Sequence, residues 1–111
     1  MVDKQKALEE IRQITELIKQ TVPAERIYLF GSHAYGEPNE DSDYDFFVVI
    51  PDGSMRTREA RRAINRALAH SPLRTPTDVM ASHANSFDDR KQFNTLERIV
   101  TRNGRLLYER A

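Results

Sequence analysis

Two closely spaced aspartates, Asp43 and Asp45, are the residues of this chain best suited to chemistry. They stand directly before the apolar run FFVVI of residues 46–50, which is typical of a buried strand. Side chains two residues apart on a strand share a face, so the two carboxylates should lie about 6.5–7 Å apart along the chain. Such carboxylates repel each other, and their hard oxygen atoms suit Mg²⁺ or Mn²⁺. A solvated acidic loop is the alternative, but the direct continuation of Asp45 into the strand favours a metal site.

A candidate phosphate site precedes the aspartates. The apolar run IYLF of residues 27–30 ends abruptly at Gly31-Ser32. Glycine allows a sharp turn or close approach to a ligand, and the Ser32 hydroxyl can cap a short helix over residues 33–36. The N–H groups at a helix start favour anions. Taken alone, Gly31-Ser32 is explained as well by an ordinary turn.

Together these residues resemble a known signature. Gly31-Ser32, the intervening residues 33–42 and then Asp43-Tyr44-Asp45 are similar to the motif of the DNA polymerase β-like nucleotidyltransferase superfamily. The segment GSHAYGEPNEDSDYDFFVVI looks most like the minimal nucleotidyltransferases, or MNT domains. The end of the chain, from LERIV to GRLLYE, also resembles MNT domains. The resemblance therefore covers essentially the whole chain.

The resemblance implies a third carboxylate and a set of roles. Asp78, on a predicted strand, stands where the superfamily places its third carboxylate, after the long helix. A surface or capping aspartate is the alternative interpretation. By resemblance, Asp43, Asp45 and Asp78 would be catalytic and would hold two Mg²⁺ ions. Gly31 and Ser32 would hold the phosphates of a nucleoside triphosphate, ATP, from which AMP is transferred with loss of pyrophosphate.

The resemblance also implies a partner. Stand-alone MNT proteins are typically antitoxins that adenylylate a tyrosine on an all-helical HEPN toxin, a ribonuclease. We therefore expect a protein adenylyltransferase that assembles with such a toxin. Two alternatives stay open: a non-catalytic antitoxin or nucleotide-binding module that acts by contact, and a subunit of an antibiotic nucleotidyltransferase. His33 and Tyr35 stand where MNT relatives often carry arginine, which favours the binding module, whereas the three aspartates favour the enzyme.

The elements that must position these residues can be read from periodicity. We expect helices over residues 4–20, 56–70 and 92–102, and strands over residues 27–30, 46–50 and 75–81. Residues 105–109 should add a last short strand or pack as a tail. The first helix should be capped by Asp3, and the last should bury four apolar side chains: Phe93, Leu96, Ile99 and Val100. This order predicts an α/β (α+β) fold, a small mixed sheet flanked by helices, in a single nucleotidyltransferase domain of residues 1–111.

Composition excludes several classes of function. Net charge is zero over 111 residues, so no overall field attracts nucleic acid, and we expect no direct nucleic-acid binding. We interpret the arginines of residues 56–66 as a solvated face, paired with nearby acids, with one or two of them as candidates to face the nucleotide. The chain has no cysteine, so it offers neither disulfides nor thiolate metal sites. With no signal peptide and no run long enough to span a membrane, we expect a soluble cytoplasmic protein.

Overall fold

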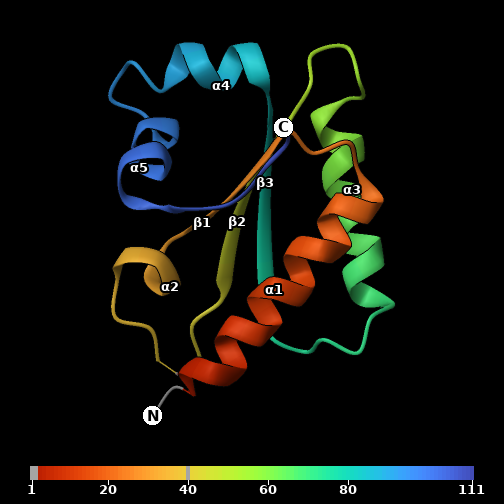
Figure 1. The fold of residues 1–111 in the computed structure, drawn as a ribbon, viewed down its shortest axis with the longest axis vertical. Helices are drawn as coiled ribbons and strands as arrows, with labels where there is room; N and C mark the ends of the chain where they lie inside the picture. Colours follow the sequence, from red (N-terminus) through yellow and green to blue (C-terminus); the bar gives the residue numbers. More distant parts are fainter. Residues whose placement is uncertain (1–2, 40) are drawn as a thin grey trace.

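The computed structural model describes residues 3–39 and 41–111, which form alternating helices and strands (Figure 1). In chain order the elements are α1 (Lys4–Thr21), β1 (Arg26–Phe30), α2 (Ser32–Tyr35), β2 (Tyr44–Ile50), α3 (Thr57–Ala69), β3 (Thr77–His83), α4 (Ala84–Arg90), α5 (Leu96–Asn103) and β4 (Arg105–Glu109). Asp3 caps α1 as expected, because its Oδ1 accepts a hydrogen bond from the Lys6 N–H at 3.1 Å.

The four strands form one mixed sheet in the order β3-β2-β1-β4. Strand β1 is antiparallel to both β2 and β4, whereas β2 and β3 are parallel. A parallel pair needs a crossover, and α3 supplies it. The mixed α/β sheet flanked by helices that the sequence predicts is thus confirmed.

Helices cover both faces of the sheet (Figure 1). Helices α1 and α3 pack on one face, and α4 and α5 pack on the other, at the left of the view. Alternation along each strand builds two cores, because successive side chains point to opposite faces. The core under α1 and α3 includes Ile14, Ile18, Ile27, Leu29, Phe46, Val48, Ile50 and Ile64. The core under α4 and α5 consists of Tyr28, Phe47, Val49, Phe87 and Val100.

The C-terminal helix differs from the sequence prediction. Helix α5 begins at Leu96 instead of residue 92, because the Thr95 hydroxyl caps it by accepting from the Arg98 N–H at 3.3 Å. Of the four apolar residues expected to be buried, only Val100 is. The other three are exposed: Phe93 by 59%, Leu96 by 37% and Ile99 by 42%.

The reason for this difference lies in α4. Phe87 of α4 is fully buried and stacks on Tyr28, with ring centroids 5.5 Å apart, so α4 occupies sheet surface that a longer α5 would cover. In α5 the buried residues are Val100 and, unexpectedly, Glu97, which accepts from the Arg90 guanidinium at 2.7 Å. The buried carboxylate of Glu97 is tolerated because the positive charge of the Arg90 guanidinium compensates its negative charge. Among the described residues, no helix is long and apolar enough to cross a membrane.

Candidate active site

Asp45 and Asp78 are brought together by the parallel pairing of β2 and β3. They are direct Cα partners across the two strands, and Phe30 on β1 is opposite Asp45 on the other side. Partners in register point to the same face, which is the face covered by α4 and α5, since Phe47 shares it with Asp45. Three neighbouring strands thus carry Asp78, Asp45 and Phe30 in one row across the sheet.

Tyr44, between the two motif aspartates, points to the opposite face and fixes their orientation. Its side chain is 2% exposed, and its hydroxyl donates to the Glu10 carboxylate of α1 at 2.7 Å. Burial, together with the Glu10 carboxylate, raises the pKa of Tyr44. With Tyr44 anchored under α1, strand alternation directs Asp45 to the other side. Asp43 directly precedes β2 and is near enough for its charge to raise the pKa of Asp45.

The carboxylates crowd one another electrostatically. Burial raises the pKa of Asp45, the negative charges of Asp78 and Asp43 raise it further, and His33 acts in the opposite direction. Like charges held this close are relieved by a cation, and carboxylate oxygens are the donors that Mg²⁺ prefers. In their present orientations, no three His, Asp or Glu side chains of the described residues converge closely enough to hold a metal ion. The donor chemistry of the aspartates nevertheless fits Mg²⁺, because carboxylate oxygens are hard ligands.

Gly31 brings the candidate phosphate turn directly against Asp45. Its φ of 76° lies in the left-handed region, and a Cβ at this position would overlap the Asp45 carboxylate. Gly31, not Ser32, is the N-cap of α2, so the expectation that the Ser32 hydroxyl caps this helix is wrong. Ser32 is instead the first helical residue, and its hydroxyl makes no capping hydrogen bond. Only glycine fits at position 31, because the turn needs a positive φ and the Asp45 carboxylate leaves no room for a Cβ.

His33 is held by the loop that leads into β2. Its ring packs edge-on against the Tyr44 ring, with centroids 4.6 Å apart, and its Nε2 lies 3.4 Å from the Ser42 carbonyl oxygen. Tyr35, at the end of α2, is 46% exposed. His33 thus orders the segment before the motif aspartates and also places a titratable ring near Asp45.

A cleft of about 330 Å³ opens over this row of side chains. It is lined by Phe30, Asp45, Arg61, Asn65, Thr77, Asp78, Val79, Met80 and Leu96. Arg61 reaches it from α3 around the free edge of β3, where its Nε donates to the Val79 carbonyl at 3.1 Å. Sequence reasoning left Arg61 and Asn65 unassigned, although their i, i+4 spacing on one helix face was a usable signal.

Most arginines of α3 are not paired with acids, contrary to our interpretation of the sequence. Of the arginines at residues 56–66, only Arg56, just before α3, comes within 4.0 Å of a carboxylate of the described residues, that of Glu59. Arg58, Arg61 and Arg62 line a shared groove with Asn65 on the exposed side of the helix. The side of α3 next to the cleft is therefore positively charged.

Comparison with known proteins identifies the family. The family model "Polymerase beta, Nucleotidyltransferase" matches residues 12–111. This chain belongs to the polymerase beta nucleotidyltransferase family. The resemblance carried by Gly31-Ser32 and the aspartates is thereby confirmed. No curated protein sequence matches the chain.

Solved structures show the same nucleotidyltransferase fold. A protein from Sulfolobus solfataricus, to which a nucleotidyltransferase function has been ascribed, is 22% identical with a TM-score of 0.64, over 93% of this chain and 80% of that one. A mutant MntA-HpeT toxin–antitoxin is 22% identical, and a toxin–antitoxin with AMP-PNP is 24% identical. Both of these have a TM-score of 0.52 and cover 88% of this chain and 72% of theirs.

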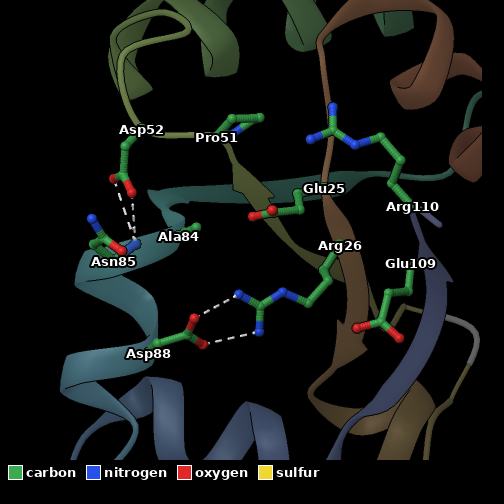
Figure 2. A pocket seen from close by; sticks show the side chains of 9 residues that line it. All are labelled: Glu25, Arg26, Pro51, Asp52, Ala84, Asn85, Asp88, Glu109 and Arg110. Carbon is green, nitrogen blue, oxygen red and sulfur yellow. Dashed lines mark hydrogen bonds and ion pairs between the residues drawn. The ribbon is translucent and has the colours of Figure 1, made fainter.

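The nucleotidyltransferase has a second pocket, shown in Figure 2. It lies where β2 ends, at Pro51, whereas Asp45 and Asp78 lie near the starts of β2 and β3. Several of its polar groups are paired within the chain: Arg26 donates to both Asp88 oxygens at 3.0 and 3.2 Å, and Asp52 accepts from the Asn85 N–H. Among the buried side-chain nitrogen and oxygen atoms of the described residues, only Glu25 Oε2 has no hydrogen-bond partner. We therefore assign the chemistry to the cleft at Asp45 and Asp78.

Proposed function

We propose that this nucleotidyltransferase transfers AMP from ATP to a hydroxyl of a partner protein, a tyrosine of a HEPN toxin, and acts as its antitoxin. The observation that carries the proposal is the pairing of Asp45 with Asp78 beside Gly31, in a cleft large enough for substrate. The fold shared with two toxin–antitoxin structures, one of them with the nucleotide AMP-PNP, supports it.

The nucleotide would be positioned by backbone and by arginine. Gly31 and Ser32 would hold the β- and γ-phosphates through their N–H groups and the Ser32 hydroxyl. Arg61 enters the cleft with one guanidinium nitrogen already bonded to the Val79 carbonyl. That bond fixes the planar group and leaves its other nitrogens to donate to phosphate oxygens.

The three aspartates would hold two Mg²⁺ ions, both through Asp43 and Asp45 and one also through Asp78. Bound there, Mg²⁺ would neutralise charge on the triphosphate and lower the pKa of the acceptor hydroxyl. The hydroxyl oxygen forms its bond to the α-phosphorus while the bond to the β-phosphate bridging oxygen breaks, and pyrophosphate leaves. Asp78, exposed on the edge strand and accessible to an acceptor, takes the hydroxyl proton. Positioning and charge neutralisation then supply most of the catalysis.

Label transfer tests the proposal. The protein is incubated with α-³²P-ATP and Mg²⁺ in an extract of its own source cells, and labelled proteins are separated and identified. We expect one labelled helical protein, and no label when Asp43→Asn or Asp45→Asn replaces the wild type. Transfer at the wild-type rate by either variant would contradict the assignment of the metal ligands.

A non-catalytic antitoxin is the second candidate, favoured by a specific observation. His33 is engaged with Tyr44 and the Ser42 carbonyl, and Tyr35 is uncharged, so α2 presents no free arginine to a triphosphate. This candidate predicts that a partner co-purifies with the protein and is neutralised without any label transfer. Under this candidate the Asp43→Asn and Asp45→Asn variants should neutralise the partner as well as the wild type does, since contact alone would suffice for neutralisation.

A further inference from the structure

Three exposed apolar side chains form a strip on and beside α5, here named the apolar strip: Phe93, Leu96 and Ile99. Their spacing of three residues places Leu96 and Ile99 on neighbouring positions of the helix surface. In α5, Glu97 and Val100 are buried, whereas Leu96 and Ile99 stay exposed. Large apolar side chains exposed near one another on a small, highly charged protein are typical of an interaction site.

The apolar strip is continuous with the catalytic cleft. Leu96 lines the cleft together with Asp45 and Asp78. Met80, 38% exposed, lines it from β3, where it lies two residues after Asp78 and therefore on the same face. Apolar side chains thus extend from the carboxylates over Met80 and Leu96 to Ile99, and Phe93 stands three residues before Leu96 in the chain.

The nucleotide alone does not account for this surface. Phe93 and Ile99 are not among the residues that line the cleft, so a nucleotide seated at the aspartates leaves them exposed. Exposing two large apolar side chains to water is unfavourable. A larger partner that reaches the cleft and continues past it would cover them.

The charge beside the apolar strip indicates the character of that partner. Arg102 is exposed and stands three residues after Ile99, so the two side chains are neighbours on α5. Neither Arg102 nor Arg98 forms an ion pair with any residue in 3–39 or 41–111. Arg102 thus places beside Ile99 a positive charge that no ion pair within the described residues neutralises, and such a surface complements an apolar protein segment with acidic flanks.

We infer that the apolar strip is the docking surface for the protein acceptor, which binds through an apolar segment with acidic flanks and so delivers its hydroxyl to the cleft. This inference rests on the proposed transfer of AMP to a protein. It predicts that the apolar strip contributes to acceptor affinity and not to nucleotide affinity. Aromatic and large aliphatic residues in such positions are the usual source of binding energy.

The test uses two variants and a matched control. Phe93→Asp and Ile99→Asp each place a charge at a partly exposed position of the apolar strip. Leu8→Asp does the same to a side chain that is 48% exposed on α1, on the opposite face of the sheet. For each protein, AMP transfer is measured against the concentration of the purified labelled acceptor, and Mg-ATP affinity is measured separately by calorimetry. Sedimentation of the wild type alone reports self-association.

We expect Phe93→Asp and Ile99→Asp to raise the KM for the acceptor about tenfold or more, with Mg-ATP affinity unchanged and Leu8→Asp like the wild type. A KM within about twofold of the wild type would overturn the docking surface while leaving the transfer itself intact. A matching loss of Mg-ATP affinity would assign the apolar strip to the nucleotide, and a wild-type dimer broken by Phe93→Asp would assign it to self-association; either result overturns the inference. If the wild type labels no protein, the proposed function fails, and the docking surface fails with it.

Discussion

Asp45 and Asp78 occupy directly paired positions on the parallel strands β2 and β3, with Asp45 half-buried and Asp78 exposed. Burial and the charges of Asp78 and Asp43 raise the pKa of Asp45. The folded chain thus holds together negative charges that the unfolded chain keeps apart. Such a cluster lowers stability and is typical of a site built to bind a cation.

Asp45→Asn should therefore abolish activity and stabilise the fold. A raised pKa means that the folded state holds the Asp45 proton more tightly, so stability falls as pH rises through the window from 3.8 to the raised value. At neutral pH the charged form opposes folding, and a neutral amide removes this repulsion. We expect AMP transfer to fall by at least about 100-fold while the melting temperature of the metal-free protein rises.

Asp89→Asn is the matched control for that experiment. Asp89 is an exposed aspartate of α4, outside the cleft, and its substitution should change neither activity nor melting temperature. Thermal melts with and without Mg²⁺ add a readout that needs no acceptor: Mg²⁺ should raise the melting temperature of the wild type and of Asp89→Asn, and have less effect on Asp45→Asn. A lower melting temperature for metal-free Asp45→Asn would refute the repulsion argument.

Gly31→Ala should disable the site through a steric overlap. The new methyl group would meet the Asp45 carboxylate, and the backbone would be held at a φ of 76°. Gly53→Ala separates the two effects, because Gly53 has a φ of 77° but nothing within 4 Å of its Cβ position. We expect Gly53→Ala to lose about 1 kcal/mol of unfolding free energy with normal AMP transfer. Gly31→Ala should lose more stability in denaturant titrations and most of its activity; equal behaviour of the two variants would mean that the overlap is harmless.

The two strands that carry the motif were predictable because their signals are local. Apolar runs bounded by turn residues predict β1 and β2, and both strands are present. That Asp43 and Asp45 share a face stays a prediction, because β2 begins at Tyr44. Asp78, which is distant from Asp45 in the sequence, was predicted only from the family resemblance, since the sequence of one strand does not show which other strand pairs with it. The expected final strand over residues 105–109 and the helix over residues 4–20 also agree with the structure.

The burial predicted from the sequence was wrong where two helices compete for the same surface of the sheet. Phe93, Leu96 and Ile99 have the spacing of a buried helix face, yet α4 already covers the sheet through Phe87. Periodicity identifies an apolar face but not what covers it, and here the face is left to the solvent. The sequence could not tell which arginine of residues 56–66 reaches the cleft, because the contact that places Arg61, with the Val79 carbonyl at a sheet edge, exists only in the folded chain.

Arg61→Gln should weaken nucleotide binding. Arg61 is the arginine of α3 that lines the cleft with the aspartates, so its loss removes positive charge from the expected phosphate path. We expect the KM for Mg-ATP to rise about tenfold, within the range for a charged hydrogen bond, with little change in the acceptor KM. Arg62→Gln is the control, because Arg62 is equally exposed on the same helix but outside the cleft. If both variants weaken Mg-ATP binding equally, the effect comes from the general field of α3 and not from Arg61.

Asp88→Asn should destabilise the protein in a pH-dependent way. Burial alone would raise the pKa of Asp88, but hydrogen bonds from Arg26 and Lys91 outweigh it and lower the pKa below its ordinary value of 3.8. A lowered pKa means that the stabilisation is fully present above pH 3.8 and is lost as pH falls through the folded-state value. Urea titrations should therefore show wild type more stable than Asp88→Asn at neutral pH, with the difference shrinking as the pH is lowered past that value. A difference that stays constant with pH would show that Asp88 stabilises the fold by packing and hydrogen-bond geometry instead of by its charge.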